Sequence, residues 1–234
     1  MSESEEIPIN KGDFLLIDYI GRIKDTGKIF ALTNEEAAKK EKMHREDGVY
    51  GPELVVVGER WIVEGLDDAL LTLKVGEQDN TIELPPEKAF GGRDSSRVKT
   101  IPIREFRKRE LKPHVGMTFR YKGSLATIQS VSGGRVRLDL NHPLAGKILS
   151  YEVTVLKKIE DTTEKIMELM KRRISTLPET LEIELPEDKV IIKIPKELFL
   201  MEGLQFAKSG IAGDIHKFLD NIALVEFLEV YERS

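Results

Sequence analysis

The sequence NHPLAGKILSYEVTVLKKI, residues 141–159, decides how this chain is organised. Its second part, residues 148–159, has the composition of a β-strand and matches the style of the predicted strand FLLIDYIGRI at residues 14–23. Residues 93–140, which lie between these strands, instead contain a basic stretch and short strand-like runs separated by glycine turns. A β-rich unit inserted into another domain is the simplest account, because insertions succeed at loop tips where chain ends lie close together.

The segments around the N-terminal strand predict a short helix packed on an antiparallel sheet. Residues 53–58 and 78–85 have the pattern of strands, and residues 61–73 carry apolar side chains at helical spacing. A further polar helix is expected to begin near residue 33, where Thr33 and Glu36 form a capping box. Trp61, the only tryptophan, is expected to pack at the entrance of the 61–73 helix.

The segment after residue 159 predicts a separate α+β unit. It contains an amphipathic helix (161–174), a hairpin (181–194), two helices (196–210 and 212–221) and a last strand (222–233). The helix at 161–174 is expected to be capped by Asp161 or Thr162. Because a long apolar final strand is a liability unless it is paired or covered, we expect this unit to form a homodimer.

Composition narrows the functional class. The chain has 234 residues, 33% of them charged, so two or three domains and a globular protein are expected. It has no cysteine, its four histidines show no metal-ligand spacing, and we expect no cofactor and no metal. A net charge of −5 argues against nucleic acid as a partner, and no apolar run approaches the ~20 residues of a membrane span. The N-terminus lacks the features of a signal peptide, so a cytoplasmic location is expected, and the charge-rich composition is thermophile-like.

Several short motifs occur in an order that resembles the FKBP family of peptidyl-prolyl isomerases, in particular its SlyD-like and archaeal long branch. They are Asp18-Tyr19-Ile20-Gly21, Gly27-Lys28-Ile29-Phe30, Val57-Gly58, Ile62-Val63-Glu64-Gly65-Leu66, Val75-Gly76-Glu77, Pro86-Glu87-Lys88-Ala89-Phe90-Gly91 and Asn141-His142-Pro143-Leu144-Ala145-Gly146-Lys147. The last of these is the most specific, since it is similar to the return crossing from an insert-in-flap domain into the final FKBP strand.

The resemblance implies an α+β fold in three parts. Residues 1–92 and 141–159 would form a discontinuous FKBP antiparallel half-barrel with a helix, and residues 93–140 a small β-rich insert. Residues 160–234 would form the C-terminal α+β domain.

The implied activity is the cis/trans isomerisation of X–Pro bonds, which needs no nucleophile, metal or general base. The planar amide faces a barrier of ~18–20 kcal/mol, and a dry aromatic pocket favours the less dipolar twisted state. By resemblance the pocket is lined by Tyr19, Phe30, Ile62, Val63, Leu66, Phe90 and Tyr151, with Leu54 or Val55 beside them. The Val63 N–H would bind the substrate carbonyl.

Three positions depart from the pattern of many family members. Ala31 stands where an aspartate often follows the phenylalanine, Leu66 replaces the tryptophan of the small members, and Phe90 replaces the flap tyrosine. Ala31 and Phe90 remove polar contacts, so they favour modest catalysis, whereas the leucine is usual in the SlyD-like branch.

The resemblance makes the insert the chaperone part, which would hold unfolded polypeptides. Its candidate client-binding residues are Ile101, Ile103, Phe106, Met117, Phe119 and Tyr121. The competing interpretation is that so small a unit needs these residues for its own core. Two other functions stay open: a holdase chaperone with vestigial isomerase activity, and an adaptor that binds one fixed partner. His142 is interpreted as a residue that shapes the crossing between domains.

Overall fold

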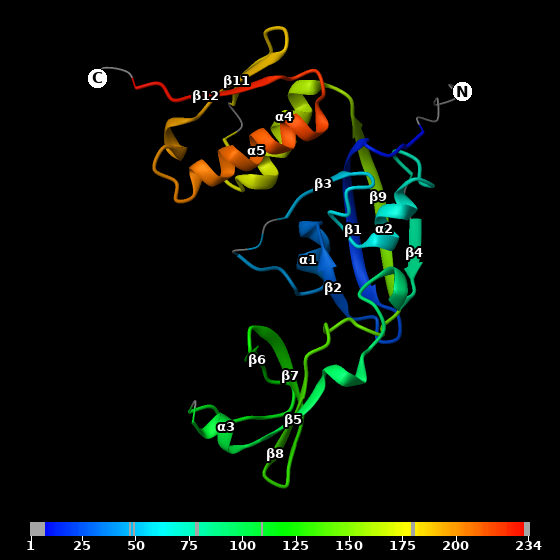
Figure 1. Cartoon of the computed structure of the whole chain (residues 1–234). Coiled ribbons are helices and arrows are strands. Elements are labelled where there is room, and N and C mark those ends of the chain that lie inside the picture. The colour runs from blue at the N-terminus through cyan, green and yellow to red at the C-terminus, as the bar shows by residue number, and fades with distance from the viewer. Residues whose placement is uncertain are drawn as a thin grey trace.

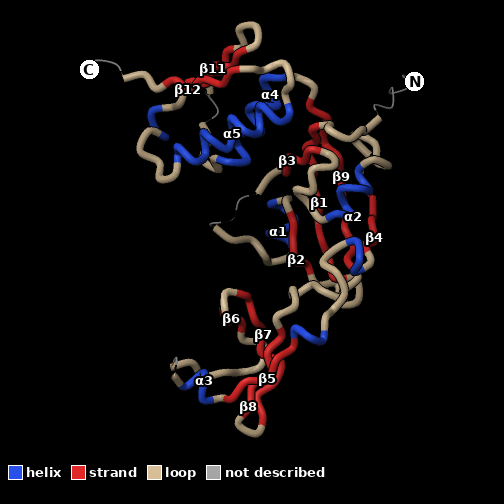
Figure 2. The backbone as a smooth tube through the Cα atoms, in the orientation of Figure 1, coloured by secondary structure: helices blue, strands red, loops and turns tan. Residues whose placement is uncertain are grey.

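The computed structural model describes residues 8–46, 48, 50–77, 80–108, 110–178 and 181–231. Their strands form three separate sheets, and their buried side chains form three apolar clusters. Figures 1 and 2 show the first sheet in the middle, with helices α4 and α5 near one end of its long strands and the β5–β8 sheet beyond the other end. The mixed α+β class expected from the sequence is confirmed. No helix in the described ranges is long and apolar enough to cross a membrane.

The first sheet is antiparallel and has the strand order β2-β1-β9-β4, with β3 paired to the same side of β1 as β2. Its strands are β1 (Phe14–Ile23), β2 (Ile29–Leu32), β3 (Glu53–Val56), β4 (Asn80–Leu84) and β9 (Leu149–Ile159). β9 lies between β1 and β4 although residues 93–140 separate it from them in the sequence. Helix α2 (Glu64–Leu70) covers one face through Leu66 and Leu70.

The second sheet lies within residues 93–140, called the insert below, and has the order β5-β8-β7-β6. Its elements are β5 (Val98–Pro102), helix α3 (Arg104–Arg107), β6 (Thr118–Tyr121), β7 (Ser124–Ser132) and β8 (Arg135–Asp139). Its core consists of Phe106, Ile128, Val136 and Leu138. Within the basic stretch, residues 104–107 form the single helical turn of α3, and Phe106 turns inward to fill this core.

Residues 160–231, called the C-terminal unit below, carry the third sheet, with the order β10-β11-β12. Its elements are α4 (Thr162–Arg173), β10 (Glu182–Glu184), β11 (Lys189–Lys193), α5 (Leu204–Phe218) and β12 (Leu224–Leu228). Asp161 caps α4, as predicted, by accepting a hydrogen bond from the Glu164 N–H (2.8 Å). β10 and β11 form the predicted hairpin, and β12 pairs with β11 in parallel because α5 carries the chain back across the sheet.

Two helix predictions were wrong. The two helices expected at 196–210 and 212–221 are a single helix, α5, and Gly210 does not break it because it packs against the side chain of Arg173. Helix α1 (Glu35–Lys40) is capped by Asn34, whose Oδ1 accepts the Ala37 N–H at 2.9 Å. Thr33 does not cap it, because its hydroxyl bonds to Asp18 (2.8 Å) and accepts the Tyr19 N–H (2.9 Å).

The C-terminal unit is fastened to the outer face of the first sheet by a shared core. Phe14, Val56 and Ile159 belong to the same buried cluster as the apolar residues of α4 and α5. Trp61 precedes α2, as expected, and its ring also meets that of Phe218 on α5 at 5.6 Å and lies 3.9 Å from the Arg172 guanidinium on α4. Shared burial of this kind holds α4 at a fixed place beside the sheet.

Candidate active site

Three aromatic rings meet on the face of the first sheet that α2 covers. The Tyr151 ring lies 5.9 Å from that of Tyr19 and 5.6 Å from that of Phe30, both in edge-to-face geometry. Tyr151 is buried, and Tyr19 and Phe30 are partly buried against the same cluster. Gly21 on β1 makes room for them, because a Cβ there would lie 2.8 Å from the Phe30 ring. The arrangement forms an apolar wall with two hydroxyl groups.

Helix α2 and the loop before it complete this site. Leu66 is buried in the same cluster, and Ile62 and Val63 pack against it. Six of the residues predicted to line a substrate pocket lie in this cluster, and we call them the aromatic pocket: Tyr19, Phe30, Ile62, Val63, Leu66 and Tyr151. Val63 is the N-cap of α2, and within the described part of the chain its N–H donates no hydrogen bond. A donor is thus left at the pocket for a carbonyl oxygen of a bound chain.

A buried carboxylate holds the loop that carries Ile62 and Val63. Asp67 of α2 is 1% exposed and accepts hydrogen bonds from the N–H groups of Gly58 (3.0 Å) and Arg60 (3.2 Å). Arg60 has a φ of 58°, a left-handed conformation that a non-glycine residue adopts at a cost. Asp67 therefore stabilises a strained turn directly before the pocket.

We expect Asp67→Ala to lower the free energy of unfolding by at least about 2 kcal/mol, since two N–H groups lose a charged acceptor. It should also reduce isomerase activity by displacing Ile62 and Val63. Asp68→Ala is the matched control, because Asp68 is exposed and its ion pairs with described residues are those with Arg60 (3.0 Å) and Lys88 (3.4 Å). Urea unfolding of both variants checks this, and equal losses would contradict the assignment.

The Tyr19 hydroxyl is held by a residue that the sequence did not indicate. It donates a hydrogen bond of 2.8 Å to Glu53 Oε2 at the start of β3. Ala31, which follows Phe30, has no carboxylate, and Glu53 supplies one from the neighbouring strand. No sequence signal separates this glutamate from the other charged residues of a strand end, because the pairing depends on β2 and β3 both lying beside β1.

Both pocket tyrosines are kept neutral. Burial, followed by the charge of Glu53, raises the pKa of Tyr151 to about 12. Burial, the Glu53 charge and the hydrogen bond to Glu53 together raise the pKa of Tyr19 well above its usual value. Neither phenol ionises near neutral pH, so the pocket offers no proton-transfer group from these two side chains.

The raised pKa of Tyr151 predicts how stability depends on pH. Its folded-state pKa lies above the value of ~10 in an unfolded chain, so the stabilisation is complete below pH ~10 and is lost as pH rises toward 12. We therefore expect the unfolding free energy to fall above pH ~10 in the wild type and to fall less steeply in Tyr151→Phe. Urea unfolding of both chains across this range checks it. Parallel curves would show that Tyr151 contributes nothing.

Phe90 lies outside the cluster that holds the aromatic pocket. It is 36% exposed and stacks on His142 with ring centroids 4.1 Å apart and planes 8° from parallel. The Leu144 N–H donates to His142 Nδ1 (3.2 Å). His142 thus links the segment of Phe90, which precedes the insert, to the crossing that leads back from the insert. Among the described residues, no group of three or more histidine and acidic side chains is placed to hold a metal ion.

The two chain crossings to the insert are tied together by hydrogen bonds. The Asn141 amide accepts from the Asp94 N–H (3.0 Å) and donates to the Asp94 carbonyl (2.9 Å). Asp139 accepts from the Asn141 side chain at 2.7 Å and forms an ion pair with Arg93. The chain therefore enters the insert and returns from it at the same place, and the two ends of the insert lie side by side.

The predicted client-binding residues of the insert lie around one core. Phe106 is buried, and the others pack partly exposed against it: Ile101, Ile103, Met117, Phe119 and Tyr121. The rings of Phe106 and Phe119 are 5.1 Å apart. A shallow concavity is lined by Ile101, Glu105, Phe106, Phe119 and Tyr121. These residues thus contribute to the core of the insert and also leave part of their apolar surface exposed.

Comparisons with known proteins identify the family of this chain. Residues 5–105 match the family described as FKBP-type peptidyl-prolyl cis-trans isomerase, residues 99–144 the FKBP26 IF domain, and residues 162–232 the FKBP26 C-terminal family. The chain is 36% identical over 147 residues to the short-type peptidyl-prolyl cis-trans isomerase of Methanocaldococcus jannaschii, which covers 63% of this chain and 92% of that protein.

Two bacterial relatives are also similar. The isomerase SlyD of Helicobacter pylori is 33% identical over 115 residues, covering 48% of this chain and 62% of its own length. The 16 kDa FKBP-type isomerase of Escherichia coli is 31% identical over 111 residues, covering 45% of this chain and 73% of that protein. The chain belongs to the FKBP-type peptidyl-prolyl cis-trans isomerase family.

Proposed function

We propose that this chain isomerises X–Pro bonds of unfolded polypeptides in the aromatic pocket and captures those polypeptides with its insert. The observation that carries the proposal is the cluster itself: the Tyr151 ring contacts the rings of both Tyr19 and Phe30, and Val63 packs against the same cluster. Burying the planar, dipolar amide in such a pocket is costly, whereas the twisted amide loses resonance and is less dipolar. The pocket therefore lowers the barrier to rotation, because its apolar surroundings disfavour the planar amide more than the twisted one.

Each group in the pocket has a role in this mechanism. The rings of Phe30 and Tyr151 contact the proline ring, and the Val63 N–H binds the carbonyl before or after the rotating bond. Glu53 orients the Tyr19 ring through its hydroxyl. Because the Tyr19 hydroxyl donates its hydrogen bond to Glu53, Tyr19 provides a surface of the pocket and does not act as a general acid.

Isomerisation of a tetrapeptide with one Leu–Pro bond, followed by exchange NMR, tests the activity. We expect the wild type to accelerate it and Phe30→Leu to be about fivefold slower, since a lost aromatic contact is worth about 1 kcal/mol. Leu71→Ala is the control, because Leu71 is exposed at the end of α2. A wild type without activity, or a Phe30→Leu chain equal to it, would contradict the proposed pocket.

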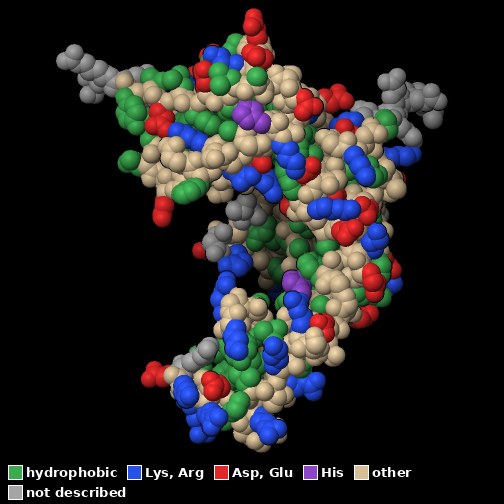
Figure 3. All heavy atoms as spheres, in the orientation of Figure 1, with side chains coloured by type: hydrophobic (Ala, Val, Ile, Leu, Met, Phe, Trp, Pro, Cys, Tyr) green, Lys and Arg blue, Asp and Glu red, His purple; other side chains and the backbone are tan. Residues whose placement is uncertain are grey.

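The insert is proposed to hold the unfolded chain near the pocket. Figure 3 shows apolar side chains surrounded by lysine and arginine on the insert, and a hollow between the insert and the C-terminal unit. The concavity of Ile101, Phe119 and Tyr121 offers loose apolar contacts suited to many sequences. The proposed division is thus catalysis in residues 1–92 and 141–159, client capture in 93–140, and assembly in 160–234.

A holdase with vestigial isomerase activity is the second candidate. It is favoured by Phe90, which stacks on His142 instead of joining the pocket cluster. The proline-dependent assays distinguish the two, since a holdase suppresses aggregation without accelerating isomerisation.

We also propose that the C-terminal unit forms a homodimer along β12. In the described part of the chain β12 pairs only with β11, and Leu224 and Leu228 are 50% and 48% exposed. Two β12 strands pairing about a twofold axis would satisfy the free edge and cover these leucines. Light scattering of the full chain should give twice the monomer mass and a monomer for Leu224→Glu/Leu228→Glu. The control Leu200→Glu, at an exposed site off the sheet, should stay dimeric; a monomeric wild type would contradict the proposal.

A further inference from the structure

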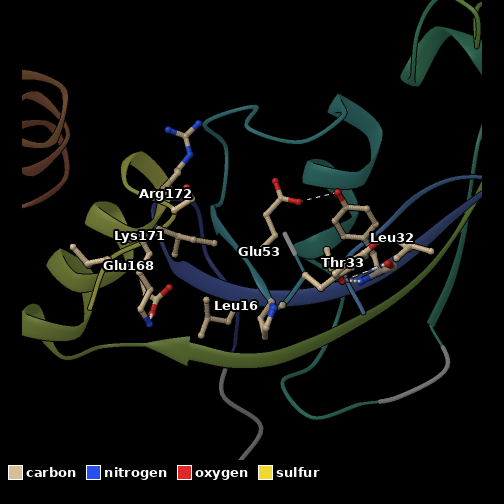
Figure 4. A pocket seen from close by; sticks show the side chains of 14 residues that line it. Leu16, Leu32, Thr33, Glu53, Glu168, Lys171 and Arg172 are labelled. Atoms are coloured by element: carbon tan, nitrogen blue, oxygen red, sulfur yellow. Dashed lines mark hydrogen bonds and ion pairs between the residues drawn. The ribbon is translucent and has the colours of Figure 1, made fainter. Parts of the chain in front are cut away.

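A cleft of about 680 Å³ lies between the edge of the first sheet and helix α4 (Figure 4). One wall comes from β1, β2 and the start of β3, including Leu16, Tyr19 and Glu53. The other wall comes from α4 and the turn after it, including Arg172 and Ser175. Its volume falls in the range of specific ligand sites, which often form at domain interfaces.

The cleft and the aromatic pocket share one residue, Tyr19. The Tyr19 ring contacts Tyr151 inside the pocket, and the same residue lines the cleft, where its hydroxyl bonds to Glu53. Along β1, Tyr19 lies between the positions that pair with β2 and those that pair with β3, and its backbone N–H and C=O are hydrogen bonded to Thr33. A chain whose proline occupies the pocket therefore reaches the cleft by passing the Tyr19 side chain.

The α4 wall stays at a fixed distance from the pocket. Leu54 and Val56 of β3 share a core with α4, and the Trp61 and Phe218 rings join the two sides at 5.6 Å. A subsite on α4 would thus sit at a constant number of residues from the bound proline. Such a fixed second contact adds specificity without any movement of domains.

The charges of the cleft are not equally available to a ligand. Glu53 already accepts from Tyr19, and Lys171 pairs with Glu168 at 2.5 Å. Arg172 makes no ion pair with a carboxylate among the described residues, and its guanidinium stacks over Trp61 instead. A stacked guanidinium keeps its in-plane N–H groups free, and these match a carboxylate.

We propose that this cleft binds the client residues that flank the X–Pro bond, and that Arg172 selects an acidic side chain among them. The proposal rests on the proposed isomerase function. It makes the C-terminal unit part of the substrate site, so that the preferred clients are segments with Asp or Glu a few residues from proline.

The first test compares a tetrapeptide with a longer peptide that carries the same Leu–Pro bond and a glutamate-containing extension on each side. For the full-length wild type we expect kcat/KM to be about tenfold higher for the long peptide, the effect of about one charge-assisted hydrogen bond. Ser175→Trp fills the cleft and should bring this ratio close to one. Thr176→Trp is the matched control, since Thr176 is the next exposed residue and does not line the cleft; it should keep the ratio.

The second test replaces glutamate in the long peptide with glutamine. The wild type should lose most of its preference for the long peptide, Arg172→Gln should show the same weak preference for both long peptides, and Arg172→Lys should recover part of the preference for glutamate. A preference for glutamate that survives Arg172→Gln would overturn the role of Arg172.

The outcomes separate this proposal from the isomerase function. A wild type that isomerises the tetrapeptide but gains nothing from the extension overturns the cleft as a subsite, and so does a Ser175→Trp chain that keeps the gain. A wild type inactive on both peptides overturns the isomerase function and the cleft with it.

Discussion

Gly21→Ala is expected to lower the kcat/KM of isomerisation on the order of 100-fold, because misplacing a catalytic wall by about 1 Å costs that much. An added Cβ would lie 2.8 Å from Phe30 Cζ and 3.1 Å from Tyr151 Cε1. Both rings would have to move, and they form the centre of the aromatic pocket. Overpacking of this kind costs about 1–3 kcal/mol of stability, so the chain should still fold.

The control for this variant is Gly213→Ala, which adds the same methyl group to α5. Nothing lies within 4 Å of a Cβ at that position, and φ there is not positive. We expect wild-type activity and a gain of about 0.5–1 kcal/mol in stability, since alanine favours a helix over glycine. Tetrapeptide kinetics and urea unfolding measure both effects. A Gly21→Ala chain as active as Gly213→Ala would show that the rings are not at the reacting bond.

Replacing residues 93–140 with a short loop is expected to separate catalysis from client capture. A short loop can replace the insert because its two ends lie side by side, as the hydrogen bonds of 2.9 and 3.0 Å between Asp94 and Asn141 show. Activity on the tetrapeptide should change little, because the aromatic pocket draws no residue from the insert. Activity on an unfolded protein should fall on the order of 100-fold, since a second linked contact raises the effective concentration of the client by such factors.

A second variant keeps the insert but makes its exposed apolar surface polar. Phe119→Ser/Tyr121→Ser serves, because both side chains are partly exposed around the buried Phe106. It should lose activity on the protein client in the same direction as the replacement. Equal loss on the tetrapeptide and on the protein would contradict the division of labour, and no loss on the protein would place client capture elsewhere.

Much of this architecture could be predicted from the sequence. The motif at residues 141–147 and the strand after it predicted the return of the chain to the first sheet, where β9 pairs with both β1 and β4. Six of the seven predicted pocket residues lie in one cluster, because strand alternation and helix spacing fix which side chains share a face.

Other features could not be read from local patterns, because they depend on contacts between distant segments. Glu53 reaches the Tyr19 hydroxyl only because β2 and β3 flank the same strand. Trp61 packs on Phe218, which is 157 positions later in the sequence, and so joins two units whose boundary lies between them. Gly210 marks a close approach to Arg173 and not a helix end.

If the aromatic pocket isomerises X–Pro bonds in proteins, the full chain should shorten the slow, proline-limited refolding phase of a test protein. The rate of that phase is measured against increasing concentrations of this chain. We predict that the wild type and Gly213→Ala shorten that phase and that Gly21→Ala barely does. A slow phase unchanged by the wild type, or shortened equally by Gly21→Ala, would show that the aromatic pocket does not isomerise X–Pro bonds in proteins.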